Sequence, residues 1–297
     1  MPTDPDNPND PNNLLYFDTN RAWWDAVVPV HEASRGYDRP GFLRGEKMLC
    51  PVEHAELGPL VAGRKLLHLQ CHFGMDTLNW ARLGATVTGL DFSQRGIEAA
   101  RRLALDSGIT GRFVQANVYD AATALGETFD IVYTGIGALN WLPDIRAWAK
   151  VAAACLRDGG LLYIFEGHPV LWTLDQDRDD PLLVLQKSYF EPAEPTRYEG
   201  DATYVDGPKL DLRPTYEWNH GLGEIITAVV DAGLRVAFVH EHREVPWRAL
   251  PSMEPVGPGT HGADGLYQSN RMWRLPESQR DLLPLMYSLL AVKTQSP

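Results

Sequence analysis

The chain has 297 residues, of which 44% are hydrophobic, and it carries a formal net charge of −12. This amount of apolar material suffices for one sizeable core with added segments, so we expect a single domain with insertions. The acidic balance argues against nucleic acid or an anionic membrane as the main partner, because both require a basic surface. No stretch approaches the roughly 18 apolar residues of a membrane span.

The N-terminus and the cysteines bear on where the protein works. Residues 1–13 are rich in Pro, Asp and Asn and hold no apolar run, so we expect a disordered tail and no secretory signal. The three cysteines, Cys50, Cys71 and Cys155, are odd in number and widely spaced, which fits neither a disulfide framework nor a zinc site. Reduced thiols in a cytoplasmic protein are the simplest interpretation.

The first half of the chain becomes regular after an aromatic segment. Residues 14–28 predict a short amphipathic helix that ends before Pro29, and a looser stretch follows to about Pro51. Strands are then expected at 65–70, 85–91, 111–117, 129–135 and 160–167, and helices at 76–84, 93–108 and 145–160. This alternation indicates crossover units and a parallel sheet with helices on both faces.

The regular pattern breaks after His168. Residues 169–218 are rich in Pro, acidic residues and aromatics, and a structureless loop of that length is improbable, so we expect a β-hairpin or small cap. A helix at 220–233 and a strand at 234–242 follow. A second irregular stretch at about 246–283 carries further aromatics, and 283–293 predicts a last strand.

The carboxyl ends of the first two strands carry a glycine and an acid. Gly74 lies in the first strand-to-helix turn, where the lack of a β-carbon lets a ligand approach the backbone. Asp91 ends the second strand, 17 residues later, where a carboxylate can accept hydrogen bonds from both ribose hydroxyls. A plain turn and a helix-capping Asp are the alternative, but the pair at this spacing favours a nucleoside cofactor.

Segments of the chain resemble, in order, the motifs of class I S-adenosylmethionine-dependent methyltransferases. LLHLQCHFGMDTLNWARLGATVTGLDFSQRGIEAA resembles motifs I and II, and QANVYD resembles the adenine-contacting motif. FDIVYTGIGALNWLPD and LRDGGLLYIFE resemble the fourth-strand and fifth-strand segments. The resemblance covers about residues 60–168, and the whole chain is similar to a group of bacterial small-molecule methyltransferases.

The resemblance implies a fold, a cofactor and a set of contacts. The fold is a Rossmann-like, doubly wound α/β sheet of seven strands, mostly parallel with the last strand antiparallel. The domain would span 14–297, with an N-terminal lid, a core at 60–168 and 219–297, and a cap inserted at about 169–218. S-adenosylmethionine would be held by Gln70, Cys71, His72, Gly74, Asp91, Phe92, Asn117, Val118 and Thr134.

This chain departs from the family's first motif, which usually reads acidic-x-Gly-x-Gly-x-Gly. The corresponding residues are His68, Gln70, His72 and Gly74, so only the last glycine remains. A dinucleotide would need the missing glycines, which argues against NAD or FAD. Gln70 and His72 can instead donate to the methionine carboxylate, and Asn117, in place of the frequent Asp, can still meet adenine.

Residues near the expected acceptor give candidates for catalysis. Glu166 and His168 follow the fifth strand, and His168 is a candidate general base or a simple loop histidine before Pro169. Glu217 and His220 are candidates for substrate binding, whereas Asn219 is expected to cap the next helix. His240 and His242 share one face of a strand, but without a third ligand we expect no metal.

Aromatic residues and histidines elsewhere suggest a lid. Candidate lid or substrate residues are Tyr16, Trp24, His31, Tyr37, Trp141, Trp218 and His220. These and the irregular stretches are expected to build an aromatic-lined chamber over the sheet, although aromatics are equally enriched in a homodimer interface.

Three functions are compatible with these features. The first is methyl transfer from S-adenosylmethionine to oxygen or nitrogen of a small-molecule acceptor. The second is a different reaction of S-adenosylmethionine on the same fold, as in a cyclase or lyase. The third is a binding protein without catalysis.

Overall fold

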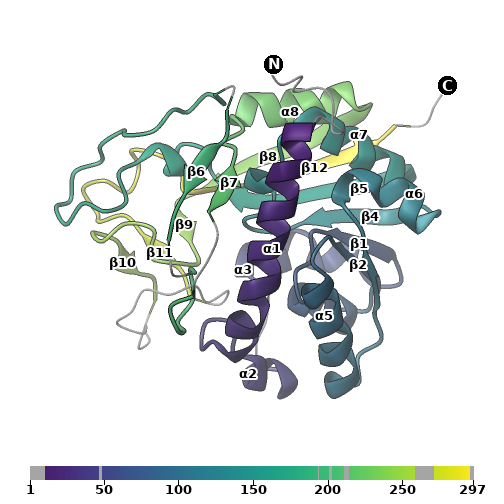
Figure 1. Ribbon diagram of the computed structural model, residues 1–297. Coiled ribbons are helices and arrows are strands. Elements are labelled where there is room, and N and C mark those ends of the chain that lie inside the picture. The colour runs from purple at the N-terminus through teal and green to yellow at the C-terminus, as the bar shows by residue number, and fades with distance from the viewer. Residues whose placement is uncertain are drawn as a thin grey trace.

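Seven strands form the central sheet of the computed structural model, which describes residues 11–46, 49–192, 194–200, 203–210, 214–257 and 271–294. The order is β3-β2-β1-β4-β5-β12-β8 (Figure 1). The strands are β1 (Lys65–Leu69), β2 (Thr86–Asp91), β3 (Arg112–Gln115), β4 (Phe129–Thr134), β5 (Leu156–Gly167), β8 (Leu234–His242) and β12 (Met286–Lys293). The first five pair in parallel, and β12 is antiparallel to both β5 and β8, which confirms the predicted fold.

Helices cover both faces of this sheet. They are α3 (Pro51–Glu56), α4 (Met75–Arg82), α5 (Gln94–Ser107), α6 (Ala121–Leu125), α7 (Ile145–Cys155) and α8 (Leu222–Asp231), with 3₁₀ turns η1 (Gly58–Leu60) and η2 (Val118–Asp120). On one face, Trp148 of α7 packs in a core with Leu67 and Ile164 of the strands. On the other, Trp80 of α4 packs with Tyr133 and Tyr163. Burial of apolar side chains on both faces drives this layering.

Helix α1 (Pro11–Ala33) is longer than expected, and the predicted end before Pro29 is wrong. Pro29 cannot donate the backbone hydrogen bond of a helix interior. The helix nevertheless continues, because Val28 and Val30 on either side of Pro29 are buried and offset that loss. Residues 11–13 of the predicted tail belong to this helix, and 1–10 lie outside the described residues.

The junction of α7 and β5 also differs from the prediction. Helix α7 ends at Cys155 rather than at the following glycines, and Leu156 already pairs with Phe129 in the sheet. Lys293 Nζ, reaching from the last strand, donates to the carbonyl oxygens of Ala153 (2.8 Å) and Leu156 (2.7 Å). This cation satisfies carbonyl groups at the helix end and favours an early stop.

Two small sheets and short helices form the rest. The insertion contains the antiparallel pair β6 (Thr196–Tyr198) and β7 (Thr215–Glu217), which confirms the expected hairpin. The second irregular stretch adds β9 (Glu244–Val245), β10 (Glu254–Pro255) and β11 (Trp273–Arg274). Also present are α2 (Arg39–Leu43), η3 (Leu139–Trp141) and η4 (Leu171–Thr173). Both small sheets lie to the left of α1 in Figure 1, and α1 contacts both α5 and β7.

No helix within the described ranges is both long and apolar enough to cross a membrane.

A substitution at Gly74 tests how tightly the first crossover turn is built. Gly74 has φ +75°, and a β-carbon there would lie 2.5 Å from Phe113 Cε1 and 2.9 Å from Ala100 Cβ. Gly63 has the same φ with no atom within 4 Å of that position. We expect Gly63→Ala to cost about 1 kcal/mol in the free energy of unfolding, and Gly74→Ala about 2–4 kcal/mol. Equal losses in urea unfolding would contradict the tight packing.

Candidate active site

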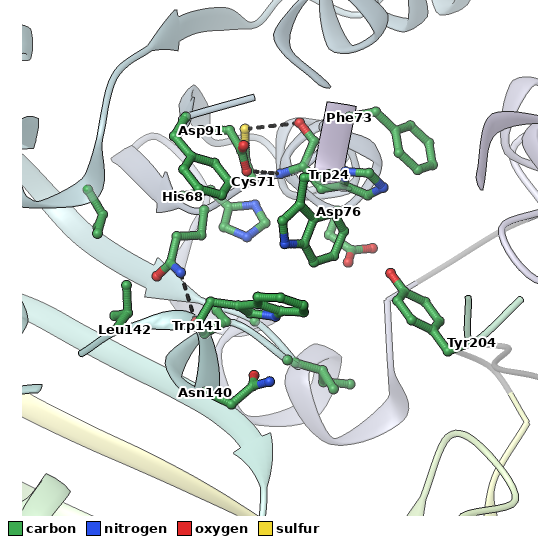
Figure 2. A pocket seen from close by; sticks show the side chains of 18 of the residues that line it. Trp24, His68, Cys71, Phe73, Asp76, Asp91, Asn140, Trp141, Leu142 and Tyr204 are labelled. Atoms are coloured by element: carbon green, nitrogen blue, oxygen red, sulfur yellow. Dashed lines mark hydrogen bonds between the residues drawn. The ribbon is translucent and has the colours of Figure 1, made fainter. Parts of the chain in front are cut away.

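A cavity of about 560 Å³ opens at the carboxyl ends of β1, β2 and β4. These ends meet where the strand order reverses, which is where open α/β sheets bind ligands. The loop after β1, the end of β2 and residues 135–142 after β4 form the floor, and α1 and the two irregular stretches add side chains. In Figure 2, Asp91 and Asn140 lie at opposite sides of the view, with Trp24 and Trp141 between them.

The loop after β1 has a left-handed backbone at three positions, of which only one is a glycine. Gln70, His72 and Gly74 all have positive φ, at +58°, +50° and +75°. A residue with a side chain adopts this left-handed conformation at a cost of about 1–3 kcal/mol. Gln70 Nε2 donates to the carbonyl oxygen of Ala138 at 2.8 Å, and the His72 amide donates to Asp91 Oδ2 at 2.8 Å. These bonds hold the loop open toward the cavity.

Asp91 is fixed at the cavity wall by its neighbours. Its Oδ2 accepts from the His72 amide, and its Oδ1 accepts from the Ser93 amide at 2.8 Å. Burial raises the pKa of Asp91 to about 6, despite these amide bonds, which favour the ionised form. The side chain is 7% exposed and lines the cavity, where the sequence placed it.

Most of the other cofactor residues predicted from the resemblance also line the cavity. They are Gln70, Cys71, His72, Gly74, Phe92, Asn117 and Val118. Asn117 Oδ1 caps η2 by accepting from the Tyr119 amide at 3.1 Å. Burial raises the pKa of Cys71 well above its usual range, so this thiol is neutral. Thr134 is the exception, because it is fully buried in β4 and does not line the cavity.

Comparisons with known proteins agree with this geometry. Residues 67–162 match the methyltransferase domain family. Ubiquinone biosynthesis O-methyltransferase from Vibrio vulnificus is 28% identical over 52% of this chain, and that from Salmonella arizonae is 32% identical over 44%. The chain spans 61% and 55% of the lengths of these relatives.

Solved structures show the same fold over more of the chain. An S-adenosylmethionine-dependent methyltransferase from Mesorhizobium loti has a TM-score of 0.52 at 18% identity, covering 82% of this chain and 96% of its own. A protein of the same description from Listeria monocytogenes has a TM-score of 0.54 at 18% identity, covering 82% and 98%. The fold of this chain is therefore that of these methyltransferases, and residues 67–162 are similar to a methyltransferase domain.

The two residues predicted for catalysis do not line the cavity. Glu166 is buried and accepts backbone amides of Gly137 (2.8 Å), Ala138 (2.6 Å), Leu139 (2.9 Å) and Gly167 (3.0 Å). Its carboxylate therefore shapes the loop after β4.

His168 is likewise engaged away from the cavity. Its Nδ1 accepts from the Val170 amide at 3.1 Å, and its Nε2 lies 3.1 Å from Glu241. Burial lowers the pKa of His168, and Glu241 only partly opposes this. We therefore assign neither His168 nor Glu166 a chemical role.

The lid residues divide into two groups. Trp24, Tyr37 and Trp141 line the cavity, and Tyr16, His31, Trp218 and His220 do not. His31 is buried behind the wall, where its Nδ1 lies 2.8 Å from His72 Nε2 and its Nε2 lies 2.7 Å from Thr203 Oγ1. Tyr16 packs against the edge of Trp218, and the Trp218 amide donates to the Asn140 carbonyl oxygen at 2.8 Å.

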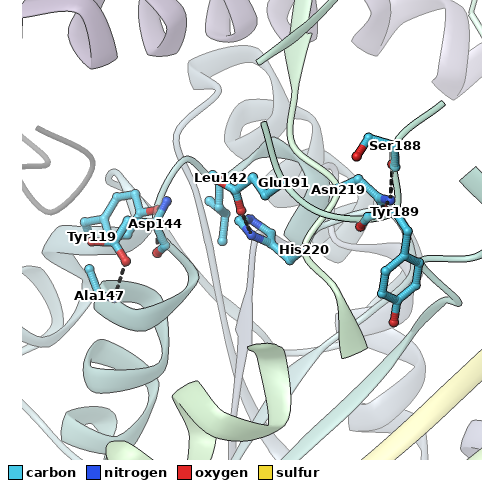
Figure 3. Close-up of polar contacts among 9 residues, drawn as sticks. All are labelled: Tyr119, Leu142, Asp144, Ala147, Ser188, Tyr189, Glu191, Asn219 and His220. Atoms are coloured by element: carbon cyan, nitrogen blue, oxygen red, sulfur yellow. Dashed lines mark hydrogen bonds and ion pairs between the residues drawn. The ribbon is translucent and has the colours of Figure 1, made fainter. Parts of the chain in front are cut away.

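His220 and Asn219 tie the insertion to the core rather than to the cavity (Figure 3). His220 Nε2 lies 2.7 Å from the Leu142 carbonyl oxygen, and its Nδ1 lies 2.5 Å from Glu191. Burial alone would lower the pKa of His220, but Glu191 outweighs it and the pKa is raised. The helix-capping role expected for Asn219 is wrong, since its amide donates to backbone carbonyl oxygens, including that of Ser188 at 3.2 Å, and Gly221 is the N-cap residue of α8.

One group of three potential metal ligands occurs among the described residues. Glu191, His220 and Glu224 each place a ligand atom within 4.8 Å of the others. His220 and Glu191 already form an ion pair at 2.5 Å, and none of the three lines the cavity.

Several cavity residues were not named as site residues from the sequence. Asp76, Asn140, Trp172 and Trp247 line the cavity from α4, η3, η4 and the second irregular stretch. Trp172 and Trp247 stack with ring centroids 5.8 Å apart and planes 8° from parallel. These two residues are far apart in the sequence and only the tertiary fold brings them together, so no local sequence pattern pairs them.

A substitution at Glu166 tests its role as an organiser of the loop after β4. In Glu166→Gln, an amide NH₂ would face backbone N–H groups that now donate to a carboxylate oxygen. We expect a loss of about 2–4 kcal/mol in the free energy of unfolding, measured with urea. Glu241→Gln, at a 54% exposed partner of His168, is the control and should cost less than about 0.5 kcal/mol. Similar small losses in both variants would refute the role.

Proposed function

We propose that this protein transfers the methyl group of S-adenosylmethionine to oxygen or nitrogen of a small-molecule acceptor. The observation that carries the proposal is the pairing of Asp91 with the left-handed loop at Gln70–Gly74. A buried carboxylate and a loop held open by hydrogen bonds stand together at the switch point of the sheet. The family match and the names of the relatives support the same reaction.

The residues present fit this cofactor. Asp91 would accept the ribose hydroxyls, and Phe92, Asn117 and Val118 would surround the adenine. The loop containing His72 would face the methionine end. Bound S-adenosylmethionine supplies a methyl carbon that is already activated by its sulfonium, so the protein's main task is alignment and exclusion of water.

The walls above the cofactor residues favour a small acceptor. Trp24 and Trp141 have ring centroids 5.1 Å apart, and Tyr37 and Tyr204 join their hydroxyls at 2.5 Å. These side chains belong to α1, the turn that follows it, η3 and the insertion, which therefore converge over the sheet. A folded protein or a nucleic acid duplex does not enter a space of about 560 Å³.

The direct test is transfer of label. Protein incubated with methyl-labelled S-adenosylmethionine and a panel of small phenols, acids and amines should yield a labelled second molecule and S-adenosylhomocysteine. Thioether released without any acceptor would favour a cyclase or lyase instead. Binding of S-adenosylhomocysteine without turnover on any compound would favour a binding protein.

Asp91→Ala tests the assignment of the ribose contact. Loss of a charge-assisted acceptor should weaken binding of S-adenosylhomocysteine by about 1–3 kcal/mol in calorimetry. In the wild type, the affinity for S-adenosylhomocysteine should be highest above a pH of about 6 and should fall below it. A protonated Asp91 cannot accept hydrogen bonds from both ribose hydroxyls. Asp91→Asn should bind weakly with no such pH dependence. Unchanged affinity in Asp91→Ala would defeat the assignment.

Hydrogen exchange tests the lid. Backbone amides in 14–42 and 169–218 should gain protection when S-adenosylhomocysteine binds, because these segments close over the cofactor residues. If the ligand protects only amides in residues 65–140, the segments pack elsewhere and the chamber model fails.

A further inference from the structure

A second cavity of about 240 Å³ adjoins the first, under the β6–β7 hairpin. Trp141, Tyr204 and Glu217 line both cavities, so these three side chains form the wall between them. Figure 2 shows Trp141 and Tyr204 on the side of the main cavity away from Asp91. A ligand group at this wall would therefore be separate from the contacts expected for the nucleoside.

Glu217 is the charged group of this wall. Its Oε2 accepts from Asn140 Nδ2 at 2.8 Å, whereas Thr215 Oγ1 lies 3.5 Å from its Oε1. Burial raises the pKa of Glu217, against the opposing effects of Asn140 and of the charge on Lys187. A carboxylate with one good hydrogen bond retains acceptor capacity, and a partner with positive charge would stabilise its ionised form.

The rings around Glu217 are suited to a cation. Trp23 and Trp141 stack with centroids 5.6 Å apart, and Tyr198 and Tyr204 also line the second cavity. The faces of aromatic rings attract cations, and recognition of substituted ammonium groups by such rings is a known use of this effect. One of these rings already contacts a cation, since Lys187 Nζ lies 4.6 Å from the centroid of the Tyr198 ring.

Acidic residues outnumber basic ones in the lining of the two cavities. Among the described lining residues, Asp76, Asp91, Glu199 and Glu217 are acidic. The one Lys or Arg among them is Arg248, whose guanidinium donates to the Pro251 carbonyl oxygen and lies 5.7 Å from the centroid of the Trp273 ring. The potential inside the cavities therefore favours a positively charged ligand.

We propose that Glu217, Trp141 and Tyr204 form a binding site for the ammonium group of the acceptor, which is then a small amine. This proposal rests on the proposed function, because only methyl transfer makes the bound amine an acceptor. Binding of the cation itself can be measured without turnover. The family match covers residues 67–162, which include Trp141 but neither Tyr204 nor Glu217.

Two probes of equal shape test the site. Choline and its neutral isostere 3,3-dimethylbutan-1-ol are titrated by calorimetry into the full chain saturated with S-adenosylhomocysteine. We expect choline to bind at least about tenfold more tightly, since only choline gains the cation–π and carboxylate attraction. Glu217→Gln should lose at least about fivefold in choline affinity while keeping its affinity for S-adenosylhomocysteine. Glu199→Gln is the matched control, because Glu199 lines the second cavity but pairs with Arg197 at 2.6 Å, and it should change choline affinity less than about twofold.

The outcomes separate this site from the proposed function. If S-adenosylhomocysteine binds but the two probes bind equally, or neither binds, the ammonium site is wrong and the cofactor assignment stands. If Glu217→Gln binds choline as tightly as the wild type does, the ammonium site is also wrong. If S-adenosylhomocysteine does not bind, the proposed function fails, and the probes titrated alone still decide the ammonium site. The wild-type comparison of the two probes needs no variant, so poor folding of Glu217→Gln leaves the test intact.

Discussion

The backbone of the loop between β1 and α4 is the constraint on which the rest of the site depends. Gln70 and His72 hold conformations that glycine adopts without steric cost, and bonds from outside the loop keep them there. Those bonds come from Ala138 after β4 and from Asp91 at the end of β2. The same contacts that stabilise the strained loop therefore also fix the floor of the cavity.

Glu166, Asp91 and Glu217 differ in how far their acceptor capacity is used. A carboxylate offers about four lone-pair sites. Glu166 accepts four backbone amides and is saturated, which makes it a structural group in spite of its position at a strand end. Asp91 accepts two amides and Glu217 one short side-chain bond, and both face a cavity. Among these three groups, remaining acceptor capacity and a place on the cavity wall separate the two carboxylates that we propose to bind ligands from Glu166.

This difference explains what the sequence could and could not predict. Hydrophobic periodicity located all seven strands, and the position of Asp91 at a strand end placed it in the cavity. Glu166 has the same kind of position, but its partners are backbone amides of the loop after β4, whose direction no side-chain pattern records. The continuation of α1 through Pro29 depends on burial of its neighbours, which is a tertiary effect. The aromatic walls come from segments without a repeating pattern. The sequence therefore predicted that these segments build an aromatic-lined chamber, but not which side chains contact one another in it.

His31 links the three parts of the molecule that enclose the cavity. Burial lowers its pKa to about 3, so its ring is neutral and has one donor and one acceptor nitrogen. One nitrogen meets His72 of the loop after β1, and the other meets Thr203 of the insertion, while the residue itself belongs to α1. Movement of α1 away from the sheet would break both contacts together and leave buried polar groups without partners. We therefore expect opening of the proposed chamber to perturb the loop at His72 as well, which would couple access to the proposed acceptor site with retention of the cofactor.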